Sequence, residues 1–287
     1  MSGPSGPQGL SGPSGPSGPG DGGDALVAEL AWYGLNFSGG SYGFAGPSAA
    51  AFDGSHIWVT NVSGPSLTEV NASDGSWVRT LSGGSYSFYA PDGVAFDGSH
   101  IWVTSPGDDS LTELNAGDGA WIRTIYGFNG PGGMAFDGSH IWVLNGGGNS
   151  VMELNASDGS LVQTLSGGSY GFNDPYAVAF DGRHLWVANV QGNSVTEVNA
   201  DGSWVRTLSG PSYSFTGPDG VAFDGSNIWV TNLGNTVTEV SASDGSLVRL
   251  FSSGLYRFND PEGLAFDGRH IWVPDTGNHS LTELPDY

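Results

Sequence analysis

Residues 51–61 read AFDGSHIWVTN, and close copies of this stretch recur along the chain. Each copy begins with Ala-Phe-Asp-Gly and continues with His, or once Asn, before Ile/Leu-Trp-Val. Short β-type runs that repeat every 40–50 residues or so are typical of radial architectures with one four-stranded sheet per repeat. The copies start at Ala51, Ala95, Ala135, Ala179, Ala222 and Ala265.

The repeat predicts an all-β fold, a single six-bladed β-propeller over residues 24–287 whose blades have four strands each. In the unit that starts at Pro91, four short runs are separated by turns that contain Gly and Asp. The first run carries Gly93 and Ala95, small residues that suit the crowded innermost strand. The units begin near residues 47, 91, 131, 175, 218 and 261.

Charged residues on the third and fourth runs are placed symmetrically about the turn between them. This spacing predicts cross-strand pairs in an antiparallel hairpin, with the Arg residues as structural partners. The predicted pairs are Glu69–Arg79, Glu113–Arg123, Glu153–Gln163, Glu197–Arg206 and Glu239–Arg249.

The two ends of the chain depart from the repeat. The last unit has no fourth run after Leu284, whereas residues 25–37 supply one spare run before the first unit. We therefore expect residues near 30–37 to close the ring by pairing with residues 281–284. Residues 1–23 hold Gly at every third position from Gly3 to Gly18, which is typical of a collagen-like tail. Such a tail is either a flexible spacer or an assembly element that forms a trimer or fibre.

The composition restricts the partners. The 287 residues carry a formal charge of −22 with only seven basic residues, which argues against binding to nucleic acid or anionic lipid. Most of the Asp residues stand in Asp-Gly turns, which explains much of the acidity. Cysteine is absent, so disulfide and thiolate chemistry are excluded. We see no membrane-spanning stretch and no signal peptide in the sequence as written.

The residue that follows the proline at the start of each unit varies between units, unlike its surroundings. As the first residue of an innermost strand, it should point to the mouth of the central channel. Ser48 and Gly132 occupy two of these positions, and the other four are predicted ligand-binding residues: Asp92, Tyr176, Asp219 and Glu262. Asp92, Asp219 and Glu262 are either Ca²⁺ or Mg²⁺ ligands, because hard cations prefer oxygen, or a solvated acidic rim. No other cofactor is predicted.

Residues repeated in every unit are interpreted as structural, so no catalytic residue is predicted. The repeated His is replaced by Asn227 in the fifth unit, and the repeated Trp should pack between blades. These residues are His56, His100, His140, His184 and His270, with Trp58, Trp102, Trp142, Trp186, Trp229 and Trp272.

Paired loop aromatics are predicted either to pack over the blades or to form a multivalent glycan-binding face. The pairs are Tyr42/Phe44, Tyr86/Phe88, Tyr126/Phe128, Tyr170/Phe172, Tyr213/Phe215 and Tyr256/Phe258. Asn-x-Ser sequons, a weak sign of glycosylation, begin at Asn36, Asn61, Asn71, Asn155 and Asn278.

Residues 177–208 (AVAFDGRHLWVANVQGNSVTEVNADGSWVRTL) and 263–284 (GLAFDGRHIWVPDTGNHSLTEL) resemble propellers of the NHL-repeat and streptogramin-lyase-like type. The resemblance covers about residues 25–287. It implies a ligand site on the face that carries the fourth-to-first and second-to-third strand loops. Streptogramin lyases typically have seven blades and use a metal with His and acidic residues on that face. Here the repeat has six units, and His279 alone lies in such a loop.

The sequence therefore predicts a non-enzymatic propeller with a structural, adhesive or recognition role. It would work outside the cell, on a cell surface or on a phage particle, against a protein or glycan surface. The alternatives are a metal-dependent streptogramin-lyase-like enzyme and a multivalent glycan-binding propeller.

Overall fold

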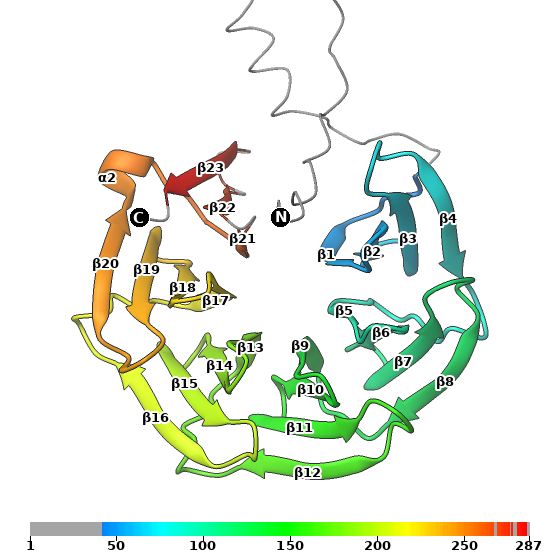
Figure 1. The fold of residues 1–287 in the computed structure, drawn as a ribbon, viewed down its shortest axis with the longest axis horizontal. Coiled ribbons are helices and arrows are strands. Elements are labelled where there is room, and N and C mark those ends of the chain that lie inside the picture. Colours follow the sequence, from blue (N-terminus) through cyan, green and yellow to red (C-terminus); the bar gives the residue numbers. More distant parts are fainter. Residues whose placement is uncertain (1–41, 267–268, 276, 278–279, 286–287) are drawn as a thin grey trace, which may run out of the picture. The chain divides into compact units, whose positions relative to one another are not determined.

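The computed structural model describes residues 42–266, 269–275, 277 and 280–285. The chain divides into two units, residues 1–38 and 39–287, and every described residue belongs to the second. In the described residues, antiparallel sheets form the six blades of a β-propeller, as predicted (Figure 1). The predicted tail and the predicted closing strand lie outside the described residues.

The first three blades each have four strands, ordered from the centre outward. Blade 1 consists of β1 (Pro47–Phe52), β2 (His56–Asn61), β3 (Ser66–Asn71) and β4 (Trp77–Ser82). Blade 2 consists of β5 (Val94–Phe96), β6 (His100–Ser105), β7 (Ser110–Asn115) and β8 (Trp121–Tyr126). Blade 3 consists of β9 (Pro131–Phe136), β10 (His140–Asn145), β11 (Ser150–Asn155) and β12 (Leu161–Ser166).

Blades 4 and 5 repeat this order, and the described part of blade 6 has three strands. Blade 4 consists of β13 (Pro175–Phe180), β14 (His184–Asn189), β15 (Ser194–Asn199) and β16 (Trp204–Ser209). Blade 5 consists of β17 (Pro218–Phe223), β18 (Asn227–Asn232), β19 (Thr236–Ser241) and β20 (Leu247–Ser252), and the short helix α2 (Ser253–Tyr256) follows it. Blade 6 consists of β21 (Ala265–Phe266), β22 (His270–Asp275) and β23 (Ser280–Pro285). No helix among the described residues is long and apolar enough to cross a lipid bilayer.

Small residues let the innermost strands approach one another at the centre of the ring (Figure 1). A Cβ atom added at Gly93 would lie 2.5 Å from the Gly132 carbonyl oxygen of the next blade. The same addition at Gly133 would lie 2.5 Å from the carbonyl oxygen of Tyr176. Any side chain at these positions would push two blades apart, which explains the Gly residues predicted for the first strand.

The core lies between neighbouring blades rather than within one blade. Trp102 on β6 is completely buried and packs with Ile141 and Val143 of the next blade. Trp58, Trp142, Trp186 and Trp229 make the equivalent contact in their own blades, which confirms their predicted packing role. Trp272 is half-buried in blade 6. Because neighbouring blades pack against each other, the second and third strands are largely buried, and their polar residues, such as Thr68 and Glu69, are buried as well.

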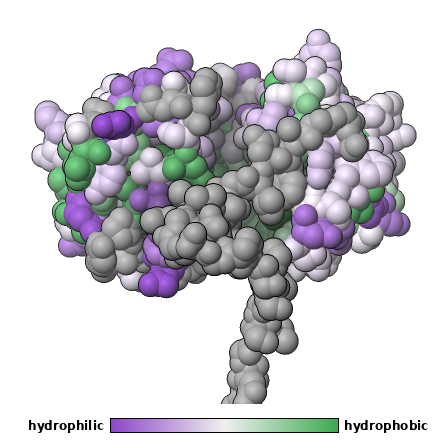
Figure 2. Space-filling view, turned by 90° about the horizontal axis from the view of Figure 1, so that it is seen from above, coloured by the Kyte–Doolittle hydropathy of each residue, from purple (hydrophilic) through white to green (hydrophobic). Residues whose placement is uncertain are grey.

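The outer strands consist mostly of exposed and partly buried residues. Trp77, Trp121 and Trp204 begin three of them and are about half exposed. Each indole Nε1 donates a hydrogen bond to a Thr hydroxyl three residues later, as Trp121 does to Thr124 at 3.0 Å. On the side of the molecule drawn in Figure 2, hydrophobic and hydrophilic residues are interspersed.

The strand register confirms the predicted cross-strand pairs. Glu113 of β7 lies opposite Arg123 of β8, and the one shorter turn still places Glu197 opposite Arg206. The remaining pairs, Glu69–Arg79, Glu153–Gln163 and Glu239–Arg249, also lie in register.

Candidate functional site

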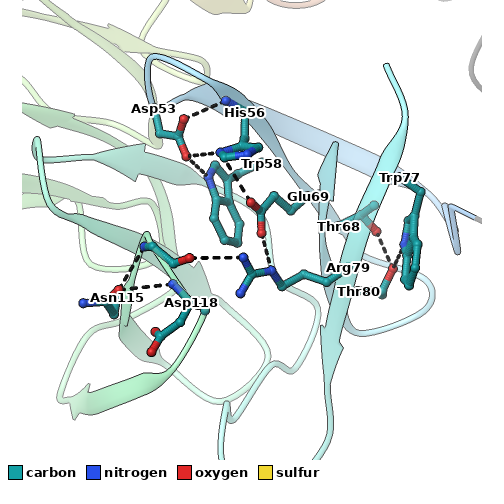
Figure 3. Close-up of polar contacts among 12 residues, drawn as sticks. Asp53, His56, Trp58, Thr68, Glu69, Trp77, Arg79, Thr80, Asn115 and Asp118 are labelled. Atoms are coloured by element: carbon teal, nitrogen blue, oxygen red, sulfur yellow. Dashed lines mark hydrogen bonds and ion pairs between the residues drawn. The ribbon is translucent and has the colours of Figure 1, made fainter. Parts of the chain in front are cut away.

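One polar network recurs in the blades at the Asp-Gly turn between the first and second strands, and Figure 3 shows it in blade 1. Asp53 Oδ1 accepts hydrogen bonds from the backbone N of Ser55 and His56, at 2.8 and 2.7 Å. Asp53 Oδ2 accepts another from Trp58 Nε1 at 2.8 Å. Burial alone would raise the pKa of this carboxyl, but these hydrogen bonds lower it overall. The Asp is therefore a turn residue, as predicted, that also holds the core Trp in place.

The His and Glu residues complete this network. His56 Nδ1 lies 3.2 Å from Asp53 Oδ2 and 3.4 Å from Oε1 of the buried Glu69 (Figure 3). Arg79 Nε lies 2.5 Å from Glu69 Oε2. Burial raises the pKa of Glu69, and the positive charge of Arg79 opposes this increase. Each charged group in the network thus has a partner within the same blade.

In the fifth blade an amide replaces the repeated His as hydrogen-bond donor to the buried Glu. Asn227 replaces His there, and its Nδ2 donates to Glu239 Oε1 at 2.8 Å. The His–Asp and His–Glu contacts of His100 and His184 repeat those of blade 1. Because Asn keeps the contact with Glu, this position has a structural role in the blades that pair the Glu with Arg, in agreement with the interpretation of the sequence.

A different site lies where the innermost strands begin. A cavity of about 660 Å³ opens there, and we call it the channel-mouth cavity. Its lining includes every residue predicted to bind a ligand, together with Ser48 and the unpredicted Asp174: Ser48, Asp92, Asp174, Tyr176, Asp219 and Glu262. Ser48 lies on β1, Tyr176 on β13 and Asp219 on β17, whereas Asp92 and Glu262 lie in the loops shortly before β5 and β21. Side chains from five blades therefore meet in one hollow.

Asp219 is the most deeply buried of the acidic residues in the cavity, with 8% of its surface exposed. Its Oδ1 accepts a hydrogen bond from Thr231 Oγ1 at 2.9 Å. Burial, together with the nearby charge of Glu262, raises the pKa of Asp219 to about 6, although the Thr231 hydrogen bond opposes the increase. The pKa of Glu262 is also raised, by burial and by Asp260. An ionised Asp219 is thus held in a poorly solvated position.

Burial and the nearby carboxylates change the pKa of Tyr176. Burial, followed by the charges of Asp92, Asp219 and Glu262, raises its pKa to about 12. The hydroxyl therefore stays protonated at neutral pH and can donate a hydrogen bond. Ser48 Oγ donates to Asp92 Oδ1, which joins blades 1 and 2 at the rim. The cavity offers acceptor oxygens with one phenolic donor, a set suited to a cation or to a ligand rich in hydroxyl groups.

Sequence reasoning missed Asp174, which precedes Pro175 in the loop before β13. It adopts φ of 56°, and its backbone N donates to Asn149 Oδ1 at 2.7 Å. The sequence does contain a signal for this residue, because the tripeptide Asn-Asp-Pro occurs before the first strand of two units, at residues 173–175 and 259–261.

The loop aromatics pack against one another. In five of the pairs the Tyr and Phe rings stack with centroids 5.2 to 5.6 Å apart. Phe88, Phe172 and Phe215 are buried, and the hydroxyl of Tyr86 donates to the Gly119 carbonyl of the next blade at 3.2 Å. This arrangement favours packing over the alternative of a glycan-binding face, because one face of each Tyr is already covered.

The sequons have different outcomes. Asn61 is completely buried at the end of β2, where its Nδ2 donates to Thr68 Oγ1 at 3.1 Å. This burial argues against a glycan on Asn61 in the folded protein, because the glycan would have to enter the core. Asn71 and Asn155 lie at strand ends, partly exposed, and their Nδ2 atoms donate to Ser76 and Ser160. Asn36 and Asn278 lie outside the described residues.

Comparison with solved structures supports the architecture. No protein-family model matches the chain, and no curated protein is similar enough in sequence to match. A streptogramin B lyase structure is similar with a TM-score of 0.67 and 17% identity, over 85% of this chain and 84% of that chain. A catalytically inactive variant of virginiamycin B lyase from Staphylococcus aureus, with quinupristin, is similar with a TM-score of 0.70 and 17% identity, over 85% of this chain and 81% of that chain.

A third similar structure is the computationally designed protein Ika8, with a TM-score of 0.65 and 13% identity over 84% of this chain and 71% of that chain. At such identities the likeness shows the fold alone. The chain is a β-propeller, and similar folds occur both in streptogramin B and virginiamycin B lyases and in a designed protein.

Proposed function

We propose that this protein is a non-enzymatic recognition propeller that works outside the cell, on a cell surface or on a particle, and that it binds a protein or glycan surface at the channel-mouth cavity. One observation supports this proposal above the others. The cavity gathers the positions at which otherwise similar blades differ, namely Ser48, Asp92, Tyr176, Asp219 and Glu262. In blades 1, 2 and 4 the repeated Asp, His and Glu residues are instead engaged in hydrogen bonds and ion pairs within their own blade.

The chemistry of the cavity favours a hard divalent cation. Asp92, Asp219 and Glu262 offer carboxylate oxygens, which are the ligands that Ca²⁺ and Mg²⁺ prefer. A bound cation would relieve the unfavourable burial of an ionised Asp219. It would also present open coordination positions to the hydroxyl or carbonyl oxygens of a partner. Residues 1–23 would then act as a spacer, or as an assembly element that multiplies the binding sites.

A metal-dependent lyase of the streptogramin-lyase type is the second candidate, and the similarity in fold favours it. A histidine would be expected near the metal, since the inactive virginiamycin B lyase variant carries a His-to-Ala change. Among the described residues that line the cavity there is no histidine. His279 lies outside the described residues.

We expect fluorescently labelled protein to bind an array of glycans and surface proteins in the presence of Ca²⁺, and to lose that binding in EDTA. A triple variant, Asp92→Asn with Asp219→Asn and Glu262→Gln, should lose the same signal while still melting cooperatively at a temperature no lower than that of the wild type. Equal signals from the wild type and the triple variant would contradict recognition at the cavity.

The same preparations separate the second candidate from the first. Quinupristin incubated with the wild type and Mg²⁺ should keep its mass and its chromatographic retention over many hours. Cleavage that EDTA stops would overturn the non-enzymatic proposal in favour of the lyase.

A further inference from the structure

Blade 3 lacks the cation that neutralises the buried Glu in the blades with the same network. Arg123 Nε lies 2.7 Å from Glu113 Oε2 in blade 2, and blades 1, 4 and 5 have the equivalent ion pairs. In blade 3 the Arg position holds Gln163, whose Nε2 donates to Glu153 Oε2 at 2.6 Å. An amide satisfies the hydrogen bond, but it brings no positive charge. Blade 3 therefore has one more negative charge in this network than blades 1, 2 and 4.

The remaining groups of this network have the spacing of metal ligands. His140 Nδ1 lies 3.2 Å from Asp137 Oδ2 and 3.2 Å from Glu153 Oε1. One ligand atom from each residue lies within 4.8 Å of the others. In a tetrahedral zinc site the bonds to nitrogen and oxygen are about 2.0–2.2 Å long, which places neighbouring ligands roughly 3.3–3.6 Å apart. Small shifts of the side chains would thus bring three ligands onto one ion.

Burial and outer contacts also fit such a site. The side chains of Asp137 and Glu153 are only 6% and 4% exposed, so their charges are poorly solvated, whereas His140 is 29% exposed and leaves a path to solvent. Trp142 Nε1 donates to Asp137 Oδ2 at 2.8 Å. This bond and that of Gln163 fix the two carboxylates, as the outer hydrogen bonds of protein metal sites do.

We propose that blade 3 binds one divalent transition-metal ion, with Zn²⁺ as the best fit, through Asp137, His140 and Glu153 in place of the missing guanidinium. An imidazole nitrogen with two carboxylates suits Zn²⁺ better than Ca²⁺ or Mg²⁺, which prefer oxygen alone. The site lies at the Asp-Gly turn where β10 begins, whereas the channel-mouth cavity lies where the innermost strands begin. The two sites are thus separate and can be tested independently.

The repeat itself supplies variants that should fold. Gln163→Arg restores the residue of the other blades, and His140→Asn copies Asn227 of blade 5. Isothermal titration of Zn²⁺ into EDTA-treated protein should show one saturable site in the wild type. Both variants should weaken zinc binding at this site by at least about tenfold, because one loses a ligand and the other fills the site with a guanidinium.

Two further variants provide the controls. His100→Asn alters the matching position of blade 2, where Arg123 is present, and should bind zinc as the wild type does. Arg123→Gln should add a second zinc site at Asp97, His100 and Glu113. The wild type and all the variants share the other surface carboxylates. Zinc bound there therefore contributes equally to every isotherm and does not affect the comparison. Equal zinc isotherms for the wild type and Gln163→Arg would overturn the proposal, and so would a wild type that binds no zinc.

Discussion

Replacement of Trp102 with alanine should lower the free energy of unfolding by about 3–5 kcal/mol, because large-to-small changes in a core lose both burial and packing. Trp102 is completely buried and fills the interface between blades 2 and 3, against Ile141 and Val143. Its Nε1 also donates to Asp97 Oδ2 at 2.8 Å. The truncation therefore leaves a cavity between two blades and removes a donor from a buried carboxylate. Urea denaturation followed by tryptophan fluorescence measures the loss.

A second Trp of the same blade is the matched control. Trp121 begins the outer strand β8, is 46% exposed, and donates to the Thr124 hydroxyl. Trp121→Ala should lower the free energy of unfolding by about 1 kcal/mol or less, as surface changes usually do. Similar losses for the two variants would contradict an architecture held together by the inter-blade Trp residues.

Replacement of Asp219 with asparagine should stabilise the protein at pH 7 by about 1–3 kcal/mol. Burial raises the pKa of Asp219 to about 6, so the folded protein holds the ionised form at a cost of roughly 1.4 kcal/mol per pKa unit. An asparagine keeps the shape and can accept the Thr231 hydrogen bond without a charge. A residue that lowers stability at neutral pH is typical of a binding site, where function opposes stability.

The pH dependence of this gain has a defined sign. Well below the ordinary Asp pKa of 3.8, Asp219 is protonated in the folded and unfolded states, so the variant and the wild type should be equally stable. Between about pH 4 and 6 the unfolded state ionises first, and the wild type loses stability relative to the variant. Asp244→Asn is the control, because Asp244 is exposed and hydrogen bonds from Ser246 lower its pKa. It should bring no gain at pH 7, and a constant gain of Asp219→Asn from pH 4 to pH 7 would refute the burial of its charge.

The blade architecture and the strand register could be predicted because the repeat encodes them locally. The period defines one blade, and the positions of Glu113 and Arg123 about a single turn fix the hairpin between β7 and β8. The channel-mouth residues could also be predicted, since a proline marks the start of the innermost strand in each unit. In both cases the order of residues within one repeat was sufficient for the prediction.

The contacts that give these residues their chemistry depend on neighbouring blades and were not predictable. Thr60 and Thr104 donate to the backbone of the following blade, whereas the equivalent Thr231 donates to Asp219 in its own blade. The burial of the Asn61 sequon likewise follows from packing at the end of β2. The sequence shows that Gln163 stands where other blades have Arg. The proposed metal site, however, follows only from the distances around His140.

Calorimetric titration of Ca²⁺ and Mg²⁺ tests most directly whether the channel-mouth cavity is the binding site of this propeller. The titration should be made into EDTA-treated wild type and into the triple variant with Asp92→Asn, Asp219→Asn and Glu262→Gln. We expect the wild type to show one saturable site for at least one of the two cations at millimolar concentration or below, and the triple variant to show none. Identical isotherms for the two proteins, or no saturable binding by the wild type, would contradict cation-assisted recognition at the cavity.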